Sequence, residues 1–176
     1  MPTTITALTK INIIYGLKFL ILLTLATFAP LLGIHSQWLT GPIVNVALIL
    51  AVYLIGVRPA ILIGILPSTI ALSAGLLPAP LAPMIPFIIL GNTLMILTVD
   101  WFKNENAYWS GIIFGAAGKF CLLFFTSNLV IHLLIQPVLA PAVSQMMSWP
   151  QFVTAILGGI IARAVLKIGK INYVKN

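Results

Sequence analysis

The chain has 176 residues, of which 61% are hydrophobic and only 6% are charged, with a formal net charge of +7. A water-soluble domain has about a quarter of its residues charged, so this composition excludes one and predicts an all-α integral membrane protein. The nine basic residues lie singly at the ends of apolar runs and form no basic face, which argues against nucleic-acid binding.

Proline, glycine and polar clusters divide the chain into six apolar runs, each long enough to cross about 30 Å of hydrocarbon as a helix. The predicted spans cover residues 17–34, 41–57, 59–76, 84–102, 108–135 and 147–168 of one membrane domain, 1–176. The first run is predicted to be a retained span rather than a signal peptide, because its one small-residue site, Ala29, is followed by Pro30.

A proline-rich connection, LPAPLAPMIP at 77–86, separates the third and fourth predicted spans. Each proline removes a backbone donor and favours an extended conformation in the residue before it. We therefore predict an outer loop or lid here rather than a continuous helix.

Basic residues at the span boundaries all fall on one side of this arrangement. They precede the first span, lie in the second and fourth connections, or close the chain: Lys10, Lys18, Arg58, Lys103, Arg163, Lys167, Lys170 and Lys175. The connections at 34–40, 77–83 and 136–146 carry no Lys or Arg. The positive-inside rule therefore predicts a multi-pass protein of the cell membrane with both termini in the cytoplasm. Boundary aromatics agree, with Trp38 and Trp149 outside and Tyr15, Trp101, Tyr108, Trp109 and Tyr173 inside.

Lys119 is the one basic residue that falls far from both boundaries of a predicted span. An ionisable group at membrane depth is a functional-site hypothesis by default, because an ammonium near the bilayer centre costs about 2.5 to 3.5 kcal/mol on insertion scales. The only acids, Asp100 and Glu105, fall beside Lys103 at the water-facing end of a hairpin. We therefore predict that an anionic ligand supplies the partner of Lys119.

Two other interpretations of Lys119 stay open. If the fifth span runs over residues 120–136, Lys119 lies at the cytoplasmic boundary and residues 109–118 form a re-entrant or interfacial piece. Alternatively, the amine is neutral and bonded to carbonyl groups.

Four further polar residues lie at depths from which they could join Lys119. By the helical rise of 1.5 Å per residue, Lys119 and Asn92 both lie about 18 Å from the cytoplasmic side, whereas Asn45 lies higher, where Gln151 and Thr154 also reach. We predict that these residues line an outward-facing pocket for a carboxylate or an acidic heterocycle, because side-chain amides offer paired donors and acceptors. Each has a structural alternative, which is interhelical hydrogen bonding for the asparagines and a plain helix start for the other two.

Small residues at four-residue spacing predict close helix packing and a compact bundle. Three sets have this spacing: Gly111 and Gly115 with Lys119, Ala155 with Gly159, and Gly158 with Ala162.

Several local strings of the chain resemble those of one transporter family. They are GPIVN at 41–45, GVRP at 56–59, LPAPLAP at 77–83, PFIILGN at 86–92, GKF at 118–120 and PQFVTAILGG at 150–159. Together with six short spans, both ends inside, and polar residues gathered toward the outer half, they are similar to the substrate-binding S component of an energy-coupling factor (ECF) transporter.

The resemblance implies a protein that captures a vitamin or related micronutrient outside the cell and works with a transmembrane coupling subunit and two cytoplasmic ATPases. The chain has no G-x-x-x-x-G-K-[ST] loop, so the energy of ATP must come from those partners. Many S components present small residues of the first helix to the coupling subunit. Here Ala26 and Ala29, followed by Pro30, depart from the usual four-residue alanine spacing.

Two other classes of function compete with transport. A six-helix membrane scaffold for envelope synthesis needs no ligand, and a buried Lys119 without an acid partner argues against it. An intramembrane enzyme is disfavoured because the spans contain no paired acids, no His pair at i, i+4 and no G-x-S-x-G. The single Cys121 and the distant His35 and His132, which we place at boundaries, give no disulfide or metal-ligand set, so we expect neither a metal nor a cofactor.

Overall fold

The computed structural model describes residues 3–31, 37–73, 79–134 and 140–170, and every regular element in these ranges is helical. The long helices are α1 (Thr3–Leu31), α2 (Gln37–Leu54), α3 (Val57–Ser73), α4 (Ile85–Trp101), α5 (Tyr108–Leu134) and α7 (Trp149–Ile168). Two short helices, the 3-10 helix η1 (Ala79–Met84) and α6 (Ala140–Met146), precede α4 and α7. The predicted all-α class is confirmed.

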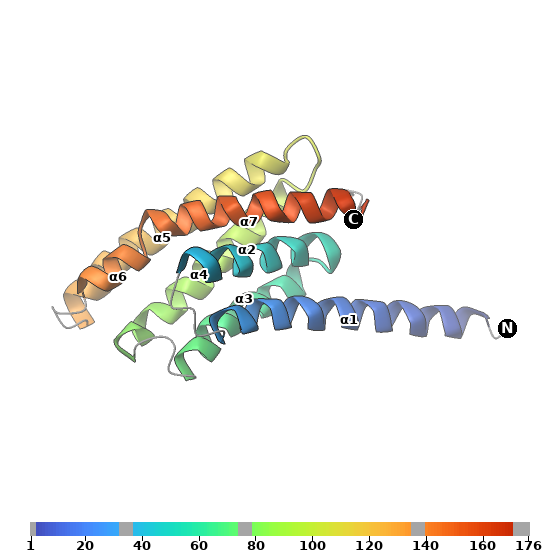
Figure 1. Ribbon diagram of the computed structural model, residues 1–176, viewed down its shortest axis with the longest axis horizontal. Helices are drawn as coiled ribbons and strands as arrows, with labels where there is room; N and C mark the ends of the chain where they lie inside the picture. Colours follow the sequence, from blue (N-terminus) through green and yellow to red (C-terminus); the bar gives the residue numbers. More distant parts are fainter. Residues whose placement is uncertain (1–2, 32–36, 74–78, 135–139, 171–176) are drawn as a thin grey trace.

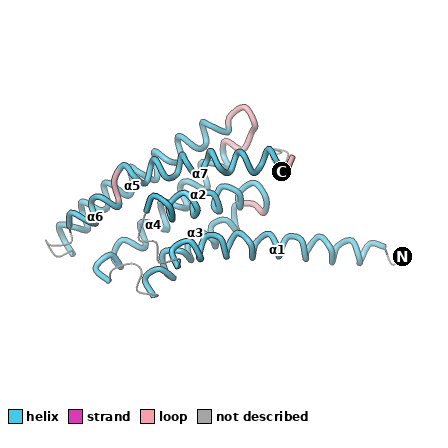
Figure 2. The backbone as a smooth tube through the Cα atoms, viewed as in Figure 1, coloured by secondary structure: helices cyan, strands magenta, loops and turns pink. Residues whose placement is uncertain are grey.

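The long helices run alternately in opposite directions, so both ends of the chain lie at the same end of the bundle (Figure 1). The α2–α3 and α4–α5 connections, drawn as loops in Figure 2, lie at this end too, which we call the inner end. The short helix α6 lies at the opposite, outer end, and α1 projects past the other helices at the inner end.

Each predicted span corresponds to one long helix, with boundaries within four residues except at the start of α1. That helix begins at Thr3 rather than at residue 17, because its first turns extend past the rest of the bundle and need not be apolar. Residues 79–84 of the proline-rich connection form η1, so no continuous α-helix crosses it. His35, Tyr173 and Lys175, which were given boundary positions, lie outside the described residues.

The helices have the length and the apolar exterior of a membrane protein. Four apolar segments are long enough to cross a bilayer, and two shorter apolar helices accompany them: Gln37–Leu54, Leu81–Trp101, Tyr108–Leu133 and Val143–Ile168, with Asn12–Phe28 and Val57–Ile70. Large apolar side chains point outward, among them Phe125, which is 70% exposed, and Leu133, which is 69% exposed. Lipid, unlike water, accommodates such a surface without cost.

Helix α2 forms the centre of the bundle. All residues from Asn45 to Tyr53 are buried, and the helix packs against α1, α3, α4 and α7. The turn that follows it depends on Gly56, whose φ of 90° lies in the left-handed region that glycine enters freely. This turn reverses the chain into α3 at the inner end.

Two glycines on α7 let that helix pack closely against α2 and against α5. A Cβ added at Gly158 would lie 2.7 Å from Cβ of Asn45, and one added at Gly159 would lie 2.6 Å from Cγ2 of Ile112. Ala155 and Ala162 of the same predicted small-residue pairs are fully buried. The predicted packing role of these residues in the last span is confirmed.

We therefore expect Gly158→Ala to lower the free energy of unfolding by about 1 to 3 kcal/mol, as overpacking of a close helix contact typically does. Thermal unfolding in a mild detergent measures it. The matched control is Gly16→Ala on α1, where an added Cβ meets no heavy atom within 4 Å. Equal stability of the two variants would contradict the close α2–α7 contact.

Candidate functional site

Lys119 lies in the middle of α5 and is almost completely buried, with 4% of its surface exposed. The helix is continuous from Tyr108 to Leu134, so at 1.5 Å per residue Lys119 lies about 16 Å from its inner end. The boundary interpretation required residues 109–118 to be a separate piece. The unbroken helix argues against a re-entrant break at residues 109–118, and the depth of Lys119 in the membrane stays a prediction.

The described partner of Lys119 is a side-chain amide rather than an acid. Nζ of Lys119 donates a hydrogen bond of 2.9 Å to Oδ1 of Asn45 on α2, and Asn45 is 1% exposed. Neither acid of the chain takes this place, because Asp100 is about 12 Å further along α4 than Asn92 at 1.5 Å per residue and Glu105 is exposed in the α4–α5 connection. The site therefore contains a buried lysine amine that pairs with no carboxylate on the described chain.

The predicted depth of Asn45 was wrong, and the cause lies in the start of α2. That helix begins at Gln37, four residues before the predicted span at 41. Asn45 consequently lies deeper in the bundle than the prediction placed it. The long side chain of Lys119 spans the remaining distance to Asn45.

Asn92 on α4 lies in the same layer as Lys119, as predicted. A Cβ added to its neighbour Gly91 would be 3.3 Å from Cγ of Lys119, so the lysine stem crosses α4 at this glycine. Nδ2 of Asn92 donates a hydrogen bond of 3.0 Å to the Gly64 carbonyl oxygen on α3. Its Oδ1 atom is buried and has no hydrogen-bond partner among the described residues.

The layer therefore combines unused donors with an unused acceptor. An ammonium has three N–H donors, and the described contacts of Lys119 use one of them, with Asn45. Oδ1 of Asn92 is the unused acceptor. A buried polar group without a partner costs roughly 1 to 3 kcal/mol, and a charged one costs more. Such groups suit a small ligand that carries an anionic oxygen and an N–H or O–H donor.

Gln151 and Thr154 make contacts that belong to helix packing. Oγ1 of Thr154 donates to the Gln151 carbonyl oxygen at 3.2 Å, and a Cβ added at Gly41 would lie 2.9 Å from Cβ of Thr154. Nε2 of Gln151 donates to the Met146 carbonyl oxygen at 3.1 Å, where α6 passes into α7. The described hydrogen bonds do not join either residue to Lys119, so their contact with a ligand stays a prediction.

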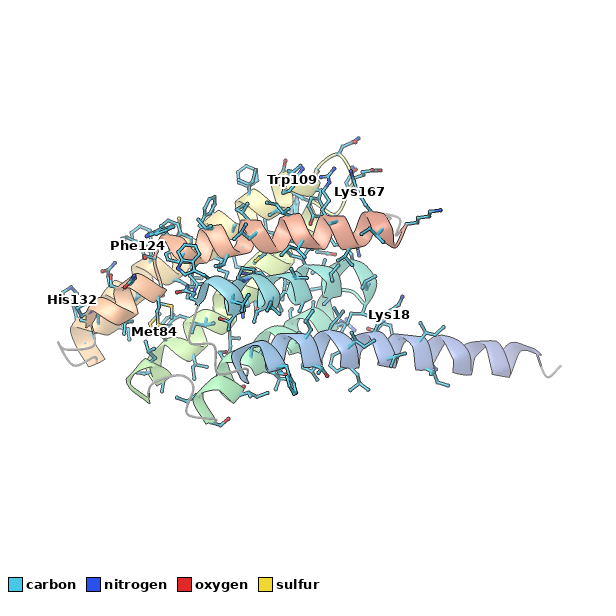
Figure 3. The ribbon with its side chains drawn as sticks, in the orientation of Figure 1. Lys18, Met84, Trp109, Phe124, His132 and Lys167 are labelled. Carbon is cyan, nitrogen blue, oxygen red and sulfur yellow. The ribbon has the colours of Figure 1, made fainter. Side chains whose placement is uncertain are left out.

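An apolar cluster separates Lys119 from the outer end. It comprises Leu81, Met84, Leu123, Val130, Val143 and Met147, which come from η1, α5, α6 and the α6–α7 junction. Leu123 lies one turn beyond Lys119 on α5 and is fully buried. Figure 3 shows Met84 and the exposed His132 toward the outer end, away from Lys18 and Lys167. Buried apolar side chains therefore lie between Lys119 and the outer end of the bundle.

Sequence reasoning placed Gly158 in a packing pair but missed how it and two further glycines, Gly91 and Gly64, shape the site. Gly91 leaves room for the lysine stem, Gly158 accommodates Asn45, and the carbonyl oxygen of Gly64 accepts from Asn92. Gly91 and Gly158 each carry a detectable signal, because a small residue opposite a buried polar one lets helices approach. The role of the Gly64 carbonyl has no such signal, since every residue has this group.

Comparison with models of protein families, with curated proteins and with solved structures finds no match to this chain. The resemblance to S components therefore rests on the residues quoted above and stays a prediction.

Proposed function

We propose that this protein is the substrate-capture subunit of an uptake transporter for a micronutrient of the vitamin type, and that the substrate is a small anion. It spans the cell membrane six times, with the inner end in the cytoplasm. A separate transmembrane coupling subunit and two cytoplasmic ATPases complete the transporter.

The observation that carries this proposal is the buried layer of Lys119, Asn45 and Asn92. A scaffold protein would gain nothing from a buried ammonium without a carboxylate, because an apolar residue would be cheaper at this depth. Among the described residues, two N–H groups of Lys119 and Oδ1 of Asn92 have no partner, and a carboxylate with an adjacent donor would satisfy both kinds of group. Substrate enters from the outer end once η1 and α6 move apart.

The resemblance implies that small residues of the first helix contact the coupling subunit. The side chains of α1 favour a contact surface of larger residues instead. Ala26 is fully buried inside the bundle, so it is not available to a coupling subunit. The large apolar side chains that α1 exposes include Leu17, Leu20, Ile21 and Phe28. We propose that the coupling subunit meets these larger residues.

The six-span topology predicts a clear labelling pattern. In a Cys121→Ser background, cysteine at Gln145 in α6 should react with an impermeant maleimide in intact cells, whereas cysteine at Asn104 should not, because it faces the cytoplasm. Both positions are exposed, so accessibility within the protein is matched. Labelling of the Asn104 position from outside would overturn the topology.

The proposed division of labour also predicts how the purified chain behaves. Reconstituted alone in liposomes, it should bind the small molecule that co-purifies with it but should not accumulate it, since it has no nucleotide-binding loop. Uptake of the radiolabelled molecule against a gradient, with and without ATP inside, is the measurement. Concentrative uptake by the isolated chain would refute a capture subunit.

A further inference from the structure

A second cation of the chain is held in an unusual setting at the inner end. The guanidinium of Arg163 on α7 lies over the rings of Tyr108 and Trp109, with its carbon 5.0 Å and 5.2 Å from their centroids. Tyr108 is fixed in turn by a hydrogen bond of 2.6 Å from its hydroxyl to the Gly159 carbonyl oxygen. The two rings therefore hold the guanidinium in place.

The rings do not satisfy the hydrogen-bonding capacity of Arg163. Its Nη1 atom is buried and has no hydrogen-bond partner among the described residues. An aromatic face attracts the positive charge but accepts no strong hydrogen bond. A guanidinium presents its donors in a planar fork that fits the oxygens of a phosphate.

Lys167 adds a second positive charge one turn further along α7. Residues four apart on a helix lie on one face, and like charges at this spacing repel each other unless an anion lies between them. Lys167 is exposed, and Figure 3 places it with Trp109 toward the inner end. Arg163, Lys167 and Trp109 together form what we call the inner basic site.

The surroundings of the inner basic site are those of a lipid contact. The same helix also exposes several large apolar side chains: Ile160, Ile161, Val165 and Ile168. Trp109 is 40% exposed, and an exposed tryptophan at a span boundary prefers the headgroup level of a bilayer. In the proposed topology this end faces the cytoplasmic leaflet, where anionic lipids concentrate.

We propose that the inner basic site binds the phosphate of an anionic phospholipid, with the acyl chains along the apolar face of α7. This proposal depends on the proposed topology, in which the inner end of the bundle faces the cytoplasm. It does not depend on whether the protein binds a transported substrate. A bound lipid would fix the inner ends of α5 and α7 relative to each other.

Native mass spectrometry of the purified full-length protein tests the proposal, with phosphatidylglycerol and phosphatidylcholine of identical acyl chains added separately. We expect phosphatidylglycerol to bind about 10-fold more tightly, the scale of one charge-assisted hydrogen bond. Lys167→Met and Arg163→Gln should each remove most of this preference. Arg58→Met, which removes an exposed charge at the same end, should leave it unchanged.

Three outcomes would overturn the lipid site. The first is equal binding of the two lipids, and the second is a loss of preference in Arg58→Met as large as that in Lys167→Met. The third is displacement of phosphatidylglycerol by glycerol 3-phosphate at comparable concentration, which would indicate a site for free phosphates. If Arg163→Gln fails to fold, the exposed Lys167→Met decides the question alone. A retained preference in Lys167→Met would then refute the inner basic site.

Discussion

Lys119→Met should lower the affinity for the co-purifying anion by about 10- to 100-fold, because it removes a charge-assisted hydrogen bond worth roughly 1.5 to 3 kcal/mol. Methionine matches the lysine stem as far as Cε and so keeps its contact with Gly91. Isothermal titration of the purified variant, after removal of bound ligand, measures the loss. Asn92→Ala should weaken binding less, because it removes a neutral acceptor.

Arg163→Met is the matched control for this substitution, since it removes a cation from another long helix far from the Lys119 layer. It should leave the affinity for the anion nearly unchanged. Unchanged affinity in a folded Lys119→Met protein would instead make the lysine a structural donor to Asn45, and the anionic substrate would lose its support.

Asn45→Leu should lower the free energy of unfolding by about 1 to 3 kcal/mol, because it leaves a buried ammonium without its described acceptor. Leucine is close to asparagine in shape, so the contact with Gly158 changes little. Unfolding by a denaturing detergent from mixed micelles measures the loss. The double variant Asn45→Leu/Lys119→Met should recover most of it, since both members of the buried pair are then apolar.

The stability loss of the double variant should differ from the sum of the losses in the two single variants. If it equals that sum, a direct Lys119–Asn45 interaction is contradicted. Removal of an uncompensated charge at membrane depth would by itself be expected to stabilise the fold. The hydrogen bond from Lys119 to Asn45 changes this expectation, because the single substitution leaves Oδ1 of Asn45 buried without a donor. The stability of Lys119→Met should therefore lie close to that of the unchanged protein.

The helices could be predicted from sequence because hydropathy and proline and glycine breaks report directly on which segments cross a bilayer. The start of α1 at Thr3 could not, since hydropathy marks the part of a helix within lipid and not the turns that continue outside it. The short helix α6 was missed for a similar reason, as the sequence indicated only a connection between two spans.

The layer of Lys119 and Asn92 could be predicted from helical rise alone, because both residues lie on helices whose ends were placed correctly. Depth along a helix does not give the direction in which a side chain points. Thr154 was placed at a suitable depth, yet it points toward Gly41 and bonds within its own helix. Helix rotation is decided by packing, which a single sequence does not reveal.

The most direct measurement is native mass spectrometry of the full-length protein purified from cells, compared with Lys119→Met purified in parallel. The original protein should retain one small anion of defined mass, and the folded variant should be empty. A neutral molecule, or an anion retained equally by both proteins, would contradict capture of an anionic substrate by Lys119.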